Sequence, residues 1–583
     1  MSLDGQVTDE NPPTVTTTNL TSEPAGGRLA SSIVWARSFL VPAGPGSPDE
    51  GGDEAPGRVI QAVPPGSPRA APGSRAALAG PEAPAAPDGG SAPSESAGTW
   101  FGRKIVVAIV AAGVVARFLP AGPLWFDEAQ SVGIARLPVD QIFGALREDG
   151  SPPLYYLLLH FWMLLAGRSA FAVRALSGIF SVATLPLFAP LARRLLPERA
   201  RWPAILLFAS SPFAIRFADE GRMYSLVVLI VALGALAVLR ALEEPTLWRL
   251  LPVTLASGAL ALTHYWGLFL LAAFGAGLAW RAWRGDRPAG RVLVAMLASA
   301  ALFAPWAPSL LFQIGHTGTP WQHAGPFASI VAVAAWAGAI GTGPAQFVAV
   351  PFVGVLLGLV VIGAWLHLPA RKLAWIALGS AALGGICSFL LRAAVVPRYT
   401  SIGLVPYLLA AAAGVASLRQ PWAQRVLAAS IALGLVAGVL DATAPRTLAG
   451  QAATLLERDG SPQDMVVYCP DQLGPDVGRL LPGWYMQEMY PTGAFPLRVD
   501  WVDYAARNWL SSPGMFARAA TRQAGDRPVW LLESDNFTSY FGRCQQLVGD
   551  LGALRPDRVV HYLGRDPMNT TQKEYLIEYL PPP

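Results

Sequence analysis

The sequence predicts an all-α membrane protein that crosses the bilayer many times and ends in a small α/β domain. Of its 583 residues, 53% are hydrophobic and only 14% are charged, and the mean hydropathy is +0.39. No ordinary soluble domain has this balance. A long series of apolar runs follows residue 100, and charge and turn residues return after about residue 441.

Residues 1–100 are rich in Pro, Gly, Ala and Ser and show no periodicity. Because such a segment buries too little apolar surface to offset the entropy of ordering, we expect it to be disordered. Arg103 and Lys104 precede the first apolar run, so positive charge places the N-terminus in the cytoplasm. We therefore divide the chain into 1–100, a membrane domain at 101–441 and an extracytoplasmic domain at 442–583.

The membrane domain is expected to hold about 11 transmembrane helices, each needing about 20 apolar residues. Arginine-rich segments between the runs are assigned to the cytoplasm, and they lie at 193–201, 240–249, 281–291, 371–372 and 419–425. If the chain crosses the membrane between these cytoplasmic segments, several other parts lie outside: residues 219–220, residue 264, a loop at 308–326, residues 392–400 and the C-terminal domain. With residue 127 also outside, 152–167 is not a simple crossing. We expect it, and similarly 328–343, to be partly inserted or interfacial, unless a neighbouring boundary differs.

The C-terminal region reads as a small α/β domain. Strands are predicted at 465–468 and 528–532, and helices at 505–510 and 514–522. Cys469 and Cys544 both fall here. An extracytoplasmic location would allow a disulfide between them, and two unpaired thiols fit the sequence equally well. No cysteine spacing indicates a metal site.

An acidic pair, Asp127 and Glu128, follows the first apolar run. The next segment, 131–149, is amphipathic, is broken by Pro138, and suits a helix lying on the membrane surface. A carboxylate at that depth is well placed to take a proton from an acceptor hydroxyl. A role as a simple helix cap fits the same position equally well.

A second acidic cluster holds Asp219, Glu220, Arg222 and Tyr224. These side chains are suited to orienting a sugar or bracing the first pair. Taken alone, a solvated salt-bridged turn is the better interpretation, and surface pairs of that kind contribute about 0–1 kcal/mol.

Four further residues are candidates on the same outer side. His264 and Tyr265 lie at a short turn, where a substrate contact and an interfacial aromatic belt are both consistent with them. Arg398 stands against the positive-inside trend, and its planar guanidinium suits phosphate oxygens better than a snorkelling role. Arg174 fits a phosphate contact and a helix-end anchor equally.

Several motifs are absent. The chain has no phosphate-binding Gly-rich loop with Lys-Ser/Thr, no dinucleotide fingerprint and no His-Glu-x-x-His, which argues against an ATP-driven pump and a nucleotide-sugar enzyme. It also lacks a basic stripe interleaved with aromatics, so nucleic-acid binding is not expected. No cofactor is predicted. The paired carboxylates are compatible with a divalent metal, but their spacing does not indicate one.

An ordered set of short motifs resembles the GT-C glycosyltransferases, specifically the family 39-like group of protein O-mannosyltransferases and lipid A aminoarabinose transferases. The resemblance covers about 103–310 and 390–418. The motifs that carry it are at 125–129 (WFDEA), 151–156 (SPPLYY), 171–177 (FAVRALS), 192–195 (ARRL), 219–224 (DEGRMY), 263–265 (THY) and 397–399 (PRY).

The resemblance implies inverting transfer of a sugar, with mannose as the family guess, from a polyprenyl-phosphate donor at the outer face of a bacterial inner membrane. The acceptor would be a protein, a lipid or a polysaccharide. Asp127 would be the general base with Glu128 in support, and Arg174 and Arg398 would lie near the lipid phosphate. Relatives often carry Glu-Ala-Arg where this chain has a glycine at 221, which leaves open which of the two preceding acids faces the substrate.

Two rival functions remain at this stage. A transporter or flippase should carry ionisable residues in mid-helix and often has inverted repeats, whereas the apolar runs here are largely free of charge. The other rival is a non-catalytic envelope assembly protein that binds lipid carriers through its C-terminal domain.

Overall fold

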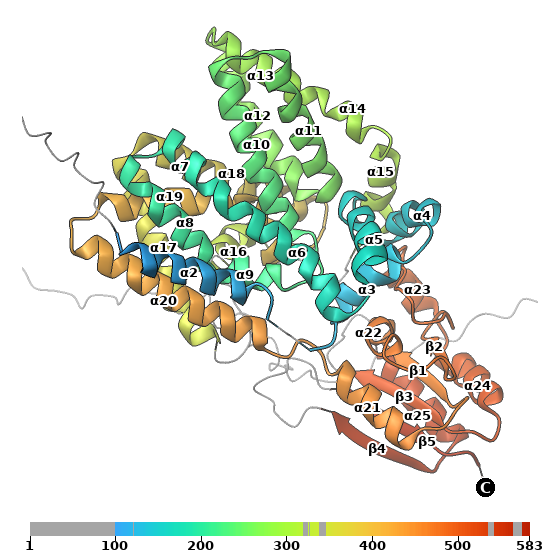
Figure 1. Ribbon diagram of the computed structural model, residues 1–583. Helices are drawn as coiled ribbons and strands as arrows, with labels where there is room; N and C mark the ends of the chain where they lie inside the picture. Colours follow the sequence, from blue (N-terminus) through green and yellow to red (C-terminus); the bar gives the residue numbers. More distant parts are fainter. Residues whose placement is uncertain are drawn as a thin grey trace, which may run out of the picture. The chain divides into compact units, whose positions relative to one another are not determined.

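The computed structural model of the protein describes residues 100–119, 122–318, 325, 327–336, 345–534, 542–563 and 574–582. We expected residues 1–100 to be disordered. All of them except Trp100 lie outside the described residues, so this stays a prediction. The helical region (Figure 1) consists of α2 (Arg103–Ala116), α3 (Phe126–Ala135), α4 (Val139–Asp149), α5 (Leu154–Ala166), α6 (Ala170–Thr184), η1 (Leu185–Leu187), α7 (Phe188–Leu195), η2 (Glu198–Ala200), α8 (Arg201–Ala209), α9 (Pro212–Ala218), α10 (Tyr224–Glu243), α11 (Leu247–Thr263), α12 (Trp266–Trp283), α13 (Arg287–Ala298), α14 (Ala300–Phe303), α15 (Ala307–His316), α16 (Ala328–Trp336), α17 (Ala345–Leu366), α18 (Leu368–Leu390), η3 (Pro397–Gly403), α19 (Leu404–Ser417) and α20 (Trp422–Thr443).

Within the described residues, six helical segments are long and apolar enough to cross a membrane, and a seventh is added if α13–α14 and α15, bent by 74°, form one span. The protein is therefore a multi-pass membrane protein, and the mostly helical fold expected from the sequence is confirmed. The count of about 11 stays a prediction. The six segments span 170–195, 224–243, 347–366, 368–390, 397–417 and 422–443.

Helix α5 occupies most of 152–167, and its partial insertion stays a prediction. Its 13 residues extend over about 20 Å, and the hydrocarbon core is about 30 Å thick, so α5 cannot cross alone. The other segment expected to be partly inserted, 328–343, forms α16 as far as Trp336. Its remainder lies outside the described residues.

One expectation was wrong: the loop at 308–326 is helical over its first part, as α15. Pro308 lies in its first turn, where a missing N–H costs nothing. The Gln313 side chain then donates to the Leu146 carbonyl of α4 at 2.9 Å. The loop was expected because 308–326 separates two apolar runs, and the chain instead continues as α15, which bonds to α4.

The amphipathic segment 131–149 forms helices with the expected break at Pro138, which is the N-cap of α4. Helix α3, however, begins at Phe126, so Asp127 and Glu128 lie in its first turn. Helix α4 ends at Gly150, whose φ of 86° gives the left-handed cap that favours glycine.

Small residues and one buried arginine hold the helices together. A Cβ on Gly363 of α17 would lie 2.3 Å from the Ala410 carbonyl oxygen of α19, so these two backbones touch, as membrane helices do at small residues. Arg117, at the end of α2, is buried and donates to Ser181 on α6 and to the Ala209 carbonyl of α8. Its charge is thereby satisfied among apolar helices.

The C-terminal domain contains both predicted strands and both predicted helices. It also contains elements that sequence patterns missed, because β2 is short and polar and β4 is largely exposed. Its elements are α21 (Ala449–Asp459), β1 (Met465–Cys469), η4 (Asp471–Leu473), α22 (Gly474–Gly478), β2 (Met486–Met489), α23 (Tyr504–Leu510), α24 (Pro513–Ala524), β3 (Val529–Ser534), α25 (Arg543–Leu554), β4 (Arg558–Leu563) and β5 (Glu574–Tyr579).

The sheet is mixed and covered on both faces (Figure 1). Its strand order is β2-β1-β3-β5-β4, with β1 parallel to β2 and β3, and β5 antiparallel to β3 and β4. Alternate residues of β1 enter different cores, as the two-residue period of a strand requires. Met465 and Val467 pack with α24 and α25, whereas Val466 and Tyr468 pack with α21.

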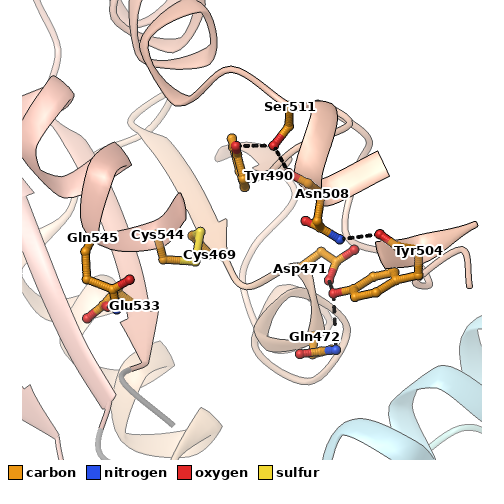
Figure 2. The surroundings of a disulfide bond; sticks show 10 residues. All are labelled: Cys469, Asp471, Gln472, Tyr490, Tyr504, Asn508, Ser511, Glu533, Cys544 and Gln545. Atoms are coloured by element: carbon orange, nitrogen blue, oxygen red, sulfur yellow. Dashed lines mark hydrogen bonds between the residues drawn. A yellow bond between two sulfur atoms is a disulfide. The ribbon is translucent and has the colours of Figure 1, made fainter. Parts of the chain in front are cut away.

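A disulfide joins Cys469, at the end of β1, to Cys544 in α25 (Figure 2). Of the two alternatives that the sequence left open, the structure thus has the bonded one. Beside it, the Tyr504 hydroxyl donates to the buried Asp471 carboxylate. The bond closes a loop with a sequence separation of 75 residues.

Replacing Cys469 with Ser should lower the stability of the C-terminal domain by about 2–4 kcal/mol, because the cross-link restricts the unfolded chain. Hydrogen exchange of peptides from β1 and α25, in the full-length protein, would measure this. Cys387→Ser, in α18 and outside the disulfide, is the matched control. Equal protection in the two variants would contradict the prediction.

Candidate active site

Three segments far apart in the sequence meet at Asp127. Its Oδ2 accepts a hydrogen bond from Arg398 Nη2 at 2.8 Å across 271 residues. Arg398, in η3, also donates through Nε to the Tyr224 hydroxyl at the start of α10 (2.9 Å), and its guanidinium carbon lies 5.6 Å from the Trp125 ring centroid. The Asp127 side chain keeps 15% of its surface exposed. Within the described residues its second carboxylate oxygen has no hydrogen-bond partner, so it is available to a ligand.

Arg222 lies beneath this carboxylate, in the turn between α9 and α10. Its Nη1 donates to the Asp127 carbonyl (3.3 Å), to Ser131 Oγ (3.0 Å) and to the Tyr156 hydroxyl (3.3 Å). Arg222 therefore ties the first turn of α3 to α5. Its expected role in substrate binding stays a prediction.

Asp149 is a site residue that the sequence interpretation missed. It ends α4, where it accepts from Gln130 Nε2 (2.8 Å) and from the Tyr156 hydroxyl (3.3 Å). A carboxylate in the last turn opposes the helix dipole. That unfavourable position, directly before Gly150, was the signal in the sequence that Asp149 has another task.

Glu128 is completely buried. Its oxygens accept from Arg174 Nε (2.8 Å) and Nη2 (2.6 Å), and from the Gly221 amide (2.7 Å). Burial alone would raise the pKa of Glu128, but the charge and hydrogen bonds of Arg174 hold that pKa below its usual range. Glu128 also accepts from the Trp125 amide and so closes the cap of α3. Glu128 is thus the helix cap that the sequence offered as one interpretation of the acidic pair. Its buried side chain fixes the first turn of α3, which carries Asp127.

Arg174, for which a contact with a lipid phosphate stays a prediction, is bonded to protein atoms in this structure. Besides its two bonds to Glu128, Arg174 donates to the carbonyls of Gly122 (2.8 Å) and Pro123 (3.0 Å). Its side chain is buried. With four hydrogen bonds to protein atoms, Arg174 holds neighbouring segments together. This corresponds to the alternative interpretation of Arg174 as a helix-end anchor.

Asp219 and Glu220 also turn away from the site. Both are buried, and Glu220 Oε2 pairs with Arg216 Nη1 at 2.5 Å. Arg446 Nη1 donates to the Asp219 carbonyl at 2.5 Å, while its Nη2 lies 3.5 Å from Asp219 Oδ2. Of the two roles expected for this cluster, sugar binding and bracing, the contacts correspond to bracing. No sequence signal identified Arg446, which follows the last membrane helix.

The Asp219–Arg446 pair is weak because desolvation outweighs attraction. Burial raises the pKa of Asp219 to about 7, although Arg446 and Arg174 oppose this. Burial likewise lowers the pKa of Arg446 to about 10. Both groups are shifted toward their neutral forms, in agreement with the long distance between Asp219 Oδ2 and Arg446 Nη2.

His264 and Tyr265 take different parts in the wall of the site. The His264 ring lies 5.2 Å from the Tyr399 ring and 5.8 Å from the Tyr224 ring. Burial, with Arg222 and Arg398 nearby, lowers the pKa of His264 to about 3, so the imidazole is neutral. The Tyr265 hydroxyl instead donates a hydrogen bond to Gln313 Oε1 and accepts one from Trp306 Nε1. The bond to Gln313 anchors α15.

No group of three or more His, Cys, Asp and Glu side chains in the described part of the chain is arranged to hold a metal ion. The two partly exposed carboxylates of the site, Asp127 and Asp149, are each held by protein donors.

Two solved structures share this fold, which confirms the fold class expected from the sequence. ArnT from Cupriavidus metallidurans in the apo state matches with a TM-score of 0.53 and 15% identity, over 82% of this chain and 98% of ArnT. The same enzyme bound to undecaprenyl phosphate matches with a TM-score of 0.50 and 14% identity, over 82% and 99%. No protein-family model and no curated protein sequence matches the chain.

Glu128→Gln should destabilise the protein by about 3–5 kcal/mol, because it leaves the Arg174 charge buried and unpaired. Denaturant unfolding in detergent micelles would measure the loss. The control is Glu148→Gln, because Glu148 pairs with Arg498 at 2.7 Å while the two side chains stay 41% and 26% exposed. That pair should contribute at most about 1 kcal/mol. Similar losses in the two variants would contradict the bracing role.

Proposed function

We propose that the protein transfers a sugar from a polyprenyl-phosphate donor to an acceptor hydroxyl, with Asp127 as the general base. One observation carries this proposal: within the described residues, a carboxylate oxygen of Asp127 without a hydrogen-bond partner lies beside an arginine that has a free donor. Mannose is the sugar that the resemblance favours. The acceptor is a protein, a lipid or a polysaccharide.

In the proposed step, the acceptor oxygen forms a bond to the anomeric carbon while the bond from that carbon to the phosphate oxygen breaks. The acceptor proton passes to Asp127, and the electron pair of the broken bond leaves with the phosphate. A base within hydrogen-bond reach of the hydroxyl typically accelerates such a step about 10²–10⁴-fold. Asp127 has the required free oxygen.

Arg398 is the proposed phosphate ligand. Two of its nitrogens hold Tyr224 and Asp127, and within the described residues Nη1 has no partner. A phosphate oxygen at Nη1 would form a charge-assisted hydrogen bond and stabilise the charge that develops on the leaving group. The same guanidinium would then hold the base and the leaving group in one geometry, which lowers the entropic cost of the reaction.

Asp149 and Tyr156 are proposed to orient hydroxyl groups of the sugar or the acceptor. They face Arg222 from α4 and α5, and Asp149 is partly exposed. The neutral ring of His264 and the Tyr399 ring form a wall that suits the apolar face of a sugar ring.

The burial pattern favours inversion at the anomeric carbon. A double displacement needs a second carboxylate as nucleophile beside the first. Glu128, the neighbour of Asp127, is buried under Arg174, and Asp149 is held by Gln130 and Tyr156. A single displacement assisted by one base inverts the configuration.

The proposed location is a bacterial inner membrane, with the site on the outer face. Arg240, near the end of α10, and Tyr224, at its start, lie at opposite ends of one candidate span, so cytoplasmic arginines leave the site outside. The disulfide suits an oxidising compartment. The polyprenyl-phosphate donor draws support from the ArnT structure that binds undecaprenyl phosphate.

Asp127→Asn should reduce sugar transfer about 10²–10⁴-fold, because it removes the proton acceptor. Proteoliposomes given a radiolabelled polyprenyl-phosphate sugar and a membrane extract as the acceptor source would measure it. The control is Asp140→Asn, an exposed residue in the first turn of α4.

Transfer that survives in Asp127→Asn would exclude Asp127 as the base. If the wild type moves labelled lipid across the bilayer without forming a glycosidic bond, the protein is a transporter. If it only retains the lipid, it is a carrier-binding assembly protein.

A further inference from the structure

A half-open cavity of about 430 Å³ is lined mainly by α10, α11, α12, α18 and α19, with further residues from α7 and α13. Its walls are largely aliphatic, with Ile230, Leu260 and Leu409 among the lining side chains. A volume of this size is within the range of ligand sites in proteins. None of the residues that hold Asp127 lines it.

The cationic rim of the cavity lies at the end of the bundle opposite the candidate active site, whereas its aliphatic wall extends back to Leu260, one turn before His264, and to Val405, next to η3. Tyr224, which contacts Arg398, begins α10, and the lining residues of α10 run from Ile230 to Leu242. The distance along the helix from Tyr224 to Leu242 is about 27 Å at 1.5 Å per residue. On α18 the lining residues lie at its start, between Leu368 and Ile376, whereas its other end leads toward η3.

Three cations border the cavity: Arg194, Arg281 and Lys372. No carboxylate is among its described lining residues. Arg194 and Arg281 pair with Glu243 and Asp286, which remain 56% and 29% exposed. Lys372 has no ion pair within the described part of the chain. The cavity therefore combines an apolar interior with one cation, Lys372, that is unpaired within the described residues, and two arginines whose carboxylate partners stay partly exposed.

We propose that this cavity binds an anionic membrane phospholipid, with an acyl chain among the aliphatic residues and the phosphate at Lys372 and Arg281. Each buried methylene contributes about 0.8 kcal/mol, and the charge at the rim selects an anionic head group. The phosphate position at Lys372 is separate from the proposed donor phosphate position at Arg398, and the inference goes beyond the proposed function.

The geometry separates this lipid from the glycosyl donor. A donor phosphate has to lie near Arg398 for transfer, and Lys372 lies at the other end of the bundle. A lipid held there would stabilise the packing of α10 against α19, since ligands that bind only the folded state raise its stability. Both helices lead to the site, α10 through Tyr224 and α19 through η3 and Arg398.

The test uses the full-length protein in detergent, with dioleoyl phosphatidylglycerol and dioleoyl phosphatidylcholine as probes. Native mass spectrometry would report binding, and thermal unfolding would report stabilisation. We expect tighter binding of the anionic lipid. Lys372→Gln and Arg281→Gln should each weaken it about fivefold, the equivalent of about 1 kcal/mol per cation near a lipid head group.

Ala235→Leu, which places a larger side chain in the cavity, should weaken both lipids. Arg284→Gln is the matched control, because Arg284 lies on the same helix end, stacks on Trp280 and does not line the cavity. Lys372 is exposed, so its variant tests the site without disturbing the core.

Equal binding of the two phospholipids, or an equal effect of Arg284→Gln and Lys372→Gln, would overturn the proposal. Displacement of phosphatidylglycerol by a lower concentration of undecaprenyl phosphate, abolished in Lys372→Gln, would overturn the assigned occupant. These outcomes concern binding alone, so they are independent of whether Asp127→Asn abolishes transfer.

Discussion

The ion pair between Glu128 and Arg174 is the interaction on which the rest of the site depends. It joins the first turn of α3 to α6, and its carboxylate also holds the Gly221 amide of the turn before α10. A Cβ at Gly221 would lie 2.6 Å from Val173 Cγ1. The glycine that departs from the family pattern therefore lets this turn approach α6 closely. Asp127, one residue before Glu128, acquires its position from this junction.

Charge in this region is arranged in two layers with different physical requirements. Glu128, Arg174 and Glu220 are buried and need partners, because an isolated charge in a low-dielectric interior is too costly to retain. Asp127 and Arg398 keep partial contact with the surroundings and leave an oxygen and a nitrogen free. Buried pairs thus fix the geometry of the exposed pair. Each layer would be less effective without the other, since a base is useful only when its position is set.

The sequence predicted the helices well and the pairing of their charges poorly. Length and hydropathy determine which segments suit a bilayer, and these are local properties. The motifs predicted that Asp127 is a site residue, and its role stays a prediction. The partners of Arg174 and Asp219 could not be predicted, because they lie 46 residues away at Glu128 and beyond the last membrane helix at Arg446. Tertiary contacts decide which of two neighbouring carboxylates faces a ligand.

The C-terminal domain is connected to the helix that carries Asp127. Gln130, one turn further along α3, donates to the Val499 carbonyl and accepts from its amide, both at 2.8 Å. A Cβ at Gly133 would lie 2.1 Å from the Leu497 carbonyl oxygen, so the two backbones touch. A backbone contact this close allows little sliding of the domain across α3. The domain therefore restrains the helix from outside while Glu128 restrains it from within, and Asp127 lies between these two restraints.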